Sequence, residues 1–372
     1  MLRLPLPGKP LHCAIGSSAC PAPCDLMLLT LLLFFGSAIA IYLACEFFVN
    51  SVEWCGKHMN LGATAVGSVL AAFGTALPES AVTFMAVVFG KTAQQKDIGV
   101  GAAMGGPLVL ATIAYGVVGL AFWLNQRKRR QAAQKNGATQ GQMSHAVAID
   151  AKRLGRDQLS FLAIFAVKVT LGLVVFAYKP WLGVLFLAAY AIYVWREINT
   201  AETSEEEEEL EPLKIRPGNP NLAWAGLQAV LALGVIAFAS HIFVSQLEAI
   251  GEGLGMAPHL VALLLSPVAT ELPETMNAII WVRQGKERLA LANISGAMMI
   301  QATIPSALGI FFTPWRFDTA LLVSGIVTAL AIVVLWLMFR KGKVDSRALA
   351  AIALLYSLFA AYMLFGKTLG LP

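Results

Sequence analysis

The sequence predicts an all-α integral membrane protein of ten transmembrane helices, arranged as two five-helix repeats of inverted topology. Three observations support this fold class. The 372 residues are 58% hydrophobic and only 13% charged, whereas soluble domains carry about 25% charged residues. Apolar runs of about 20 residues, the length that crosses a bilayer, recur along nearly the whole chain. The second half of the chain also matches the first without a gap at one fixed offset.

The predicted spans are the apolar runs between charged and turn-forming residues. In the first half they lie near 26–45, 61–89, 98–124, 158–178 and 180–196. In the second half they lie near 222–247, 258–282, 289–312, 318–339 and 347–366. The chain is thereby divided into an N-terminal tail (1–25), a first repeat (26–197), an acidic linker (198–220) and a second repeat (221–372).

Basic residues set the expected orientation. With ten spans, the loops after the third, seventh and ninth spans share one side of the membrane, which the positive-inside rule assigns to the cytoplasm. The linker 198–220 then lies inside and both termini lie outside, in the cell membrane. The net charge of +5 follows from this topology, so no nucleic-acid partner is expected. The basic loops carry RKRR at 127–130, then Arg283, Lys286 and Arg288, then Arg340, Lys341, Lys343 and Arg347.

The connections 125–157 and 198–220 are the two long polar segments. The second contains EEEEE at 205–209. We interpret both as mobile polar linkers, and the acidic run as a solvated stretch rather than a cation-sensing tail.

The repeat aligns Glu79 with Glu274, an offset of 274 − 79 = 195 residues. Because each half has an odd number of predicted spans, the second copy enters the membrane from the opposite side. Inverted repeats are typical of secondary transporters, whose substrate sites lie near the midplane where helices are interrupted. Matches at the same offset pair Phe48 with Phe243, Val49 with Val244, Glu53 with Glu248, Gly56 with Gly251, Thr75 with Thr270, and GK at 90–91 with GK at 285–286.

One motif lies near the middle of the second span of each half: GTALPES at 74–80 and ATELPET at 269–275. Pro78 and Pro273 each remove a backbone donor and clash with the preceding turn, so we expect kinks that leave carbonyl oxygens free. Free carbonyls in the membrane are suitable cation ligands.

Glu79 and Glu274 follow these prolines and place ionisable groups in mid-membrane. Such a group costs about 2.5–3.5 kcal/mol even on insertion scales and usually marks a functional site. Together with the hydroxyls of Thr75 and Thr270, the carboxylates form an oxygen-rich set that suits a hard divalent cation such as Ca²⁺, which takes about 6–8 oxygen ligands.

These motifs resemble those of the calcium/cation antiporter superfamily, the sodium/calcium exchangers, whose two inverted alpha repeats carry a GTSLPE motif. GVGAAMGG at 99–106 and LANISGAMMIQ at 291–301 resemble the motif of the following helix. The resemblance covers nearly the whole chain and implies ten helices and alternating access, with the cation cage between the repeats. It implies Glu79 and Glu274 as calcium ligands, Thr75 and Thr270 as hydroxyl helpers, and Ala72 and Pro267 as carbonyl ligands.

The chain departs from the family beside these residues. Where the family has serine after the threonine, this chain has Ala76 and Glu271. In the next helix the family has a serine and, four residues on, an asparagine or aspartate. This chain has Gly106 and Leu110 at those positions of the first half, and Ala297 and Gln301 in the second. The side-chain oxygens that are missing here belong to the sodium sites that the resemblance implies, so proton coupling is the natural substitute.

Three further polar residues are candidates for the coupling ion. Glu271 adds a third carboxylate, and crowded carboxylates resist joint ionisation, so one of them can carry a proton. Its alternative interpretation is a surface or salt-bridged glutamate. Glu46 and His241 match at the repeat offset and are candidates for gating or for a proton shuttle, although both lie near helix ends, where polar side chains reach the headgroups at little cost.

The predicted function is secondary antiport of Ca²⁺, or a similar divalent cation, for H⁺ or Na⁺ by alternating access. No cofactor is implied, and the partners are inorganic cations and the lipid bilayer; oligomeric state stays open. The alternative is an exchanger-fold protein that has lost exchange and acts as a channel or a cation sensor. An enzyme is disfavoured because the sequence shows no mid-membrane His/Asp cluster, aspartate dyad or phosphate loop.

Overall fold

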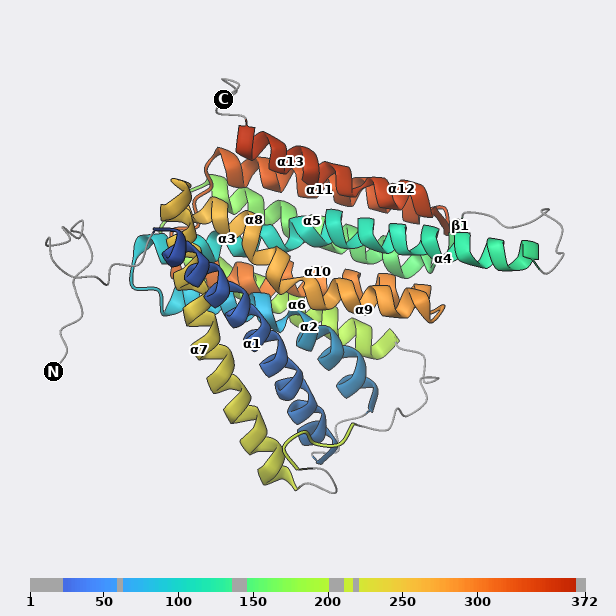
Figure 1. The fold of residues 1–372 in the computed structure, drawn as a ribbon, viewed down its shortest axis with the longest axis horizontal. Helices are drawn as coiled ribbons and strands as arrows, with labels where there is room; N and C mark the ends of the chain where they lie inside the picture. Colours follow the sequence, from blue (N-terminus) through green and yellow to red (C-terminus); the bar gives the residue numbers. More distant parts are fainter. Residues whose placement is uncertain (1–22, 59–62, 136–145, 201–210, 217–220, 366–372) are drawn as a thin grey trace, which may run out of the picture.

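The computed structural model describes residues 23–58, 63–135, 146–200, 211–216 and 221–365, and Figure 1 shows it as a helical assembly. The predicted N-terminal tail and the acidic run at 205–209 lie outside these residues, apart from the first turn of the first helix. Within the described chain the only strands form one short pair, so the predicted all-α class is confirmed.

The first half contains one group of helices before the basic connection and a second group after it. The first group is α1 (Pro23–His58), α2 (Ala63–Val88), α3 (Ala93–Val109), the π-helical turn η1 (Leu110–Ala114) and α4 (Tyr115–Lys135). The second group is β1 (Ala146–Ala148), α5 (Ala151–Leu173), the 3₁₀ turn η2 (Lys179–Leu182) and α6 (Gly183–Thr200).

The second half repeats this order with different interruptions. Its elements are α7 (Leu222–Leu254), α8 (Pro258–Thr270), α9 (Leu272–Arg283), α10 (Glu287–Phe312), α11 (Thr319–Phe339), β2 (Lys343–Asp345), α12 (Ser346–Ala351) and α13 (Ala353–Phe365).

Six helical stretches of the described chain are long and apolar enough to cross a membrane. The protein is therefore a multi-pass membrane protein by length and composition. The remaining predicted spans coincide with α2, α5, α6 and the α8–α9 pair. The six stretches are Met27–Cys55, Ala93–Arg127, Leu222–Leu254, Ala290–Phe312, Thr319–Phe339 and Ser346–Leu364.

The helix of the second motif breaks, whereas the helix of the first is assigned as unbroken. α8 ends at Thr270 and α9 begins at Leu272, with Glu271 between them in a bridging conformation (φ −93°, ψ −1°). α9 starts with a proline in its first turn, where the missing N–H breaks no helical hydrogen bond. α2 runs from Ala63 to Val88 through Pro78 as one α-helix.

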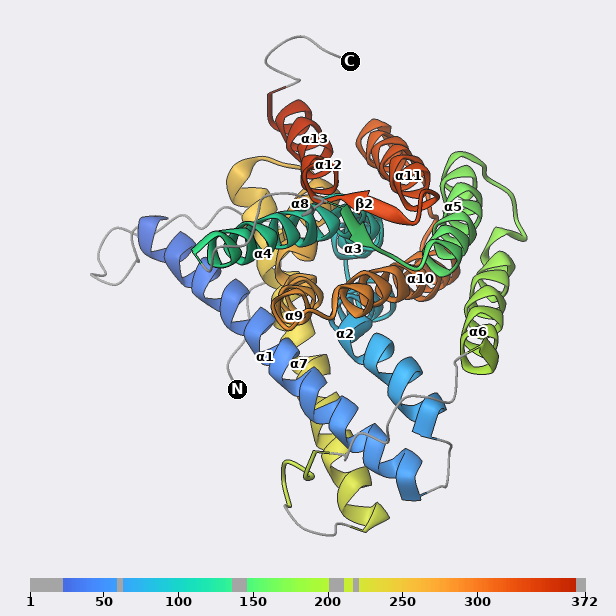
Figure 2. The same cartoon turned by 90° about the vertical axis from the view of Figure 1, so that its right-hand side faces the viewer.

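The packing separates a long helix pair from a cluster centred on α10. α1 packs along α7, and the two extend together away from the other helices in both views (Figures 1 and 2). In the cluster, α3 packs against α8, α2 and α6 against α10, α4 against α12, and α5 against α11. The motif helices α2, α8 and α9 therefore lie where the two halves meet.

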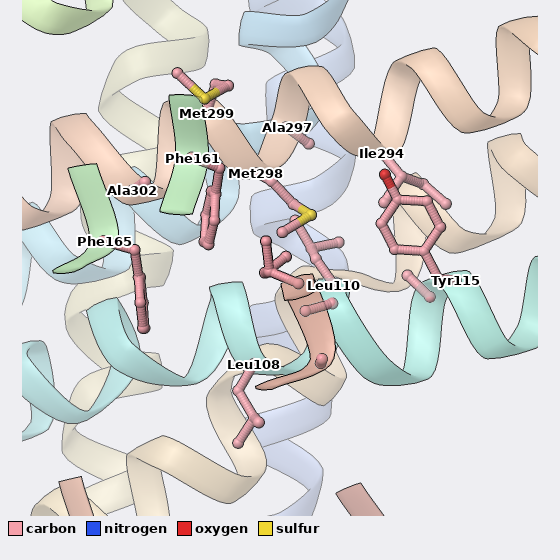
Figure 3. Close-up of a cluster of buried hydrophobic side chains, with 14 of the residues drawn as sticks. Leu108, Leu110, Tyr115, Phe161, Phe165, Ile294, Ala297, Met298, Met299 and Ala302 are labelled. Carbon is pink, nitrogen blue, oxygen red and sulfur yellow. The ribbon is translucent and has the colours of Figure 1, made fainter. Parts of the chain in front are cut away.

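A buried apolar core lies between the rod formed by α3, η1 and α4 and the helices α5 and α10. Figure 3 shows Phe161 and Phe165 of α5 beside residues Met298 and Met299 of α10 in one buried cluster, with Leu108 and Leu110 on the facing rod. The Phe161 and Phe165 rings are stacked with their centroids 5.2 Å apart. This core fixes α5 and α10 beside the motif helices.

The two connections that we predicted as mobile linkers are partly structured, so that prediction was wrong for their described parts. β1 pairs antiparallel with β2, with Val147 opposite Val344. Backbone pairing satisfies polar groups of the two short strands, which favours order over mobility there. In the other connection, Leu213 is fully buried, and Trp54 Nε1 of α1 donates to the Glu211 carbonyl at 2.9 Å.

Side-chain contacts tie distant loops together at two opposite ends of the helices. One end holds the β1–β2 pair and a bond from Asn125 Nδ2 to the Val282 carbonyl (3.0 Å). The other holds Gln95 Nε2 donating to Glu248 (2.9 Å), His259 beside Asp318 (2.7 Å), and Lys179 Nζ donating to the Trp315 carbonyl (2.8 Å).

Candidate cation site at the break between α8 and α9

Three buried glutamates come together at the meeting point of the two motifs. Glu79 lies on α2, Glu271 lies in the α8–α9 break, and Glu274 lies in the first turn of α9. Each is at most 1% exposed. Burial of a carboxylate is costly unless hydrogen bonds or cations compensate for the lost water, so the partners of these groups define what the site can do.

Thr270 links the two motifs directly. Its Oγ1 lies 2.6 Å from Glu79 Oε2 and 3.1 Å from the Ser266 carbonyl oxygen. The hydroxyl can donate only one hydrogen bond. The bond to Glu79 is the stronger of the two, because it is shorter and its acceptor is a carboxylate. The last residue of α8 is therefore held against the glutamate of α2.

Gln301 of α10 holds the third carboxylate. Its Nε2 donates to Glu271 Oε1 at 2.6 Å, and the same oxygen lies 3.5 Å from Thr270 Oγ1. Glu79, Thr270, Glu271 and Gln301 consequently form one polar chain across α2, the break and α10. All four residues are at most 3% exposed.

Several buried oxygens in this polar chain and beside it have no hydrogen-bond partner among the described residues. They include Glu79 Oε1, Glu271 Oε2 and both carboxylate oxygens of Glu274. Ser266 Oγ and Gln301 Oε1 are also buried without a partner. Folded proteins leave few buried polar atoms unpaired, and such a set of oxygens matches the ligand preference of a hard cation.

The carboxylates interact with one another but are not arranged as a finished metal site. Thr270 Oγ1 lies within 3.5 Å of a carboxylate oxygen of both Glu79 and Glu271, and Glu274 follows Glu271 by three residues. Among the described residues, no three His, Cys, Asp or Glu side chains form a group placed to hold a metal ion. The hydrogen bonds to Thr270 and Gln301 hold two of the carboxylates instead.

A comparison of the sequence with models of protein families identifies the family of this chain. Residues 29–198 and 224–365 match the family model described as sodium/calcium exchanger protein. The chain belongs to the sodium/calcium exchanger family. This confirms the resemblance found in the motifs, and because the family and its fold are transporters, it also confirms that the protein is not an enzyme.

Individual relatives are similar to this chain over most of their length. The inner membrane protein YrbG of Escherichia coli (strain K12) is 24% identical over 295 residues, which is 79% of this chain and 82% of the relative. The H⁺/Ca²⁺ exchanger CAX has a similar fold, with a TM-score of 0.65 at 18% identity, over 92% of this chain and 85% of that one. The sodium-calcium exchanger NCX_Mj gives a TM-score of 0.55 at 19% identity, over 90% and 98%.

The other predicted site residues of this exchanger lie in different surroundings. Pro267 is buried in α8, and its carbonyl oxygen accepts the Glu271 N–H at 2.8 Å. Ala72 and Thr75 lie within α2, but their side chains are outside the described residues. The structure does not bring the remaining two to the glutamates: Glu46 pairs with Lys214 at 3.2 Å, and His241 is exposed on α7.

One buried charge was missed by the sequence interpretation. Lys168 of α5 is fully buried, and its Nζ donates to the Ala103 carbonyl of α3 at 2.7 Å. The available signal was its position, because it is the one charged residue within the predicted span 158–178. An ionisable side chain in the middle of an apolar run is a functional candidate by itself.

Gly106 and Gln301 are complementary departures from the family motif. A Cβ added at Gly106 would lie 2.6 Å from Gln301 Oε1 and 3.4 Å from Glu271 Oε1. The long carboxamide of α10 therefore occupies the space that a side chain at position 106 of α3 would need.

We expect Gly106→Ala to lower the initial rate of Ca²⁺ uptake several-fold while changing stability by no more than about 1–2 kcal/mol. The flexible carboxamide can move away, but it then leaves Glu271. Gln301→Ala should have a similar effect. The double variant should be no worse than either single variant, because each of them removes the same bond, the one from Gln301 to Glu271. Gly155→Ala is the control, because a Cβ there meets nothing within 4 Å. Wild-type uptake in Gly106→Ala would contradict this assignment.

Proposed function

We propose that this exchanger moves Ca²⁺, or a similar divalent cation, in exchange for protons. The observation that carries the proposal is the set of three buried carboxylates with unpartnered oxygens at the junction of the two motifs. The relatives of known fold include an H⁺/Ca²⁺ exchanger and a sodium-calcium exchanger. Three of the four positions at which the family has neutral oxygen side chains, namely Gly106, Leu110 and Ala297, lack one here, and this favours protons over sodium as the coupling ion.

The roles of the residues follow from their positions. Glu79 and Glu274 bind the divalent cation, helped by Thr270, Thr75 and carbonyl oxygens near Ala72 and Pro267. When the cation leaves, the carboxylates repel one another, and protons relieve that repulsion. Glu271 is the proton-carrying group, held by Gln301. The α8–α9 break supplies the interrupted helix that such sites use.

We also propose ten membrane helices in two inverted repeats, 26–197 and 221–372, joined by the linker 198–220. The mirrored packing of the helices supports this. The contact of α2 with α10 has its counterpart in α8 with α3, that of α6 with α10 in α12 with α4, and that of α5 with α10 in α11 with α3. Two equivalent halves related by a pseudo-twofold axis produce such exchanged pairs.

Loop contacts support the proposed orientation in the cell membrane. The loops after the third and ninth predicted spans pair through β1 and β2, and the bond from Asn125 to Val282 brings the seventh span to the same end. These are the basic loops that the positive-inside rule assigns to the cytoplasm. Both termini are then outside.

Cysteine labelling tests this orientation. In a background with the native cysteines replaced by serine, Lys91→Cys should react with a membrane-impermeant maleimide on intact cells. Lys341→Cys should react only after permeabilisation. Both positions are exposed and lie at opposite ends of the helices. Labelling of both positions in intact cells, or the reverse pattern, would contradict the topology.

Counterflow tests exchange itself. Proteoliposomes loaded with unlabelled CaCl₂ and diluted into trace ⁴⁵Ca²⁺ should accumulate the label transiently above its equilibrium level, because an exchanger couples entry of one ion to exit of another. A channel gives no such overshoot with the membrane potential clamped, and a sensor gives no uptake. Either of those results would reject the antiporter.

A further inference from the structure

Lys168 is a fully buried ammonium in the C-terminal part of α5. Its Nζ donates to the backbone carbonyl of Ala103 on α3 at 2.7 Å. It lies 5.4 Å from the Phe165 ring centroid and 6.0 Å from that of Trp315, so aromatic faces supply part of its remaining stabilisation. Surroundings of this kind hold a cation in place without water.

The position of the ammonium relates it to the carboxylates. Ala103 lies one helical turn before Gly106, where an added Cβ would lie 2.6 Å from Gln301 Oε1 and 3.4 Å from Glu271 Oε1. The Lys168 side chain is therefore bound to the same part of α3 that faces Gln301 and Glu271. Gly106 of α3 and Leu110 of the following η1 turn lack the oxygen-bearing side chains of a sodium site.

The charges of the site balance when Lys168 is included. Glu79, Glu271 and Glu274 supply three negative charges, and Lys168 supplies one positive charge, which leaves a net charge of −2. One Ca²⁺ neutralises this charge. Without Lys168, one negative charge would remain beside the bound Ca²⁺ in a medium of low dielectric, and a second cation would be needed.

We propose that the Lys168 ammonium is a resident cation of the exchange site and stands in the place of a bound sodium ion. This inference rests on the proposed divalent-cation site at Glu79 and Glu274. It accounts for the absence of oxygen-bearing side chains at Gly106 and Leu110 as a consequence of a built-in charge. Lys168 is thus a specificity-determining residue that excludes alkali cations and weakens Ca²⁺ binding through repulsion.

The test uses purified full-length protein and two ligand series, CaCl₂ and NaCl, the latter balanced with choline chloride at constant ionic strength. Lys168→Met removes the charge and keeps an apolar side chain of similar length. Lys168→Gln removes the charge and keeps a donor for the Ala103 carbonyl, and Lys168→Arg keeps the charge. Lys179→Met is the matched control, because Lys179 is also buried, at 4% exposure, and donates to two carbonyls at the loop end of the helices.

We expect the two neutral variants to bind Ca²⁺ about tenfold or more tightly than wild type, since one repelling unit charge is removed. They should also gain a sodium-dependent rise in melting temperature. Wild type, Lys168→Arg and Lys179→Met should show no sodium-dependent rise. A folded neutral variant with wild-type Ca²⁺ affinity and no response to sodium would overturn the inference.

The wild-type protein provides a measurement that does not depend on whether a variant folds. A sodium-dependent rise in its melting temperature, relative to choline, would overturn the assignment of Lys168 directly. Absence of Ca²⁺ binding by wild type, with or without sodium, would reject the proposed divalent site instead. The two failures are therefore distinguishable.

Discussion

Glu274→Gln and Glu79→Gln are each expected to reduce Ca²⁺ uptake by about 100-fold or more. Each change removes a unit charge from the cation site, and at an effective dielectric constant of about 20 one charge about 4 Å away contributes about 4 kcal/mol. Folding should be preserved. Both Glu274 oxygens lack a hydrogen-bond partner among the described residues, and glutamine at position 79 can still accept a bond from Thr270.

Initial rates of ⁴⁵Ca²⁺ uptake, normalised to protein recovered as a single species on size exclusion, provide the measurement. Glu248→Gln is the matched control, because Glu248 accepts bonds from Thr92 and Gln95 at the loop end of the helices, away from the three glutamates. Its uptake should stay close to wild type. Uptake near that of wild type in Glu79→Gln or Glu274→Gln would reject the proposed cation site at those residues.

The second large effect concerns the coupling ion. Ca²⁺ uptake should follow an outward proton gradient and should respond at least several-fold less to an outward sodium gradient of equal size. Each pH unit supplies about 1.4 kcal/mol per proton moved, and the buried carboxylates can hold protons once the cation has left. Uptake that followed sodium and ignored pH would show that backbone or water oxygens replace the missing side chains.

Glu271→Gln separates the proton carrier from the calcium ligands. Glutamine at this position can still accept the bond from Gln301, so the local structure should persist. The variant cannot ionise, so the pH dependence of uptake should become weaker. Initial rates measured across a pH series at saturating Ca²⁺ provide the comparison. An unchanged pH profile would assign the proton to another group.

The sequence determined the helical membrane class, the family and the pairing of the two motifs. These features are one-dimensional: apolar run length, an ungapped offset and a glutamate beside a proline are all visible in the residue order. They placed Glu79 and Glu274 as buried charges, and both are buried in the structure. Glu271 was also a candidate from its position beside the pair, and it lies in the same polar chain.

Only the tertiary structure decided which partners these groups have. Three features depend on how α2, α5, α8 and α10 pack: the break at Glu271, the bond from Gln301 to it, and the bond that Lys168 makes to a neighbouring helix. Residues as far apart in the sequence as Glu79 and Thr270 come into contact only through this packing. The same packing left Glu46 with Lys214 and His241 at the surface. The physical reason is that apolar burial specifies which residues leave water, whereas a buried polar atom takes its partner from whichever neighbouring helix presents one within about 3 Å.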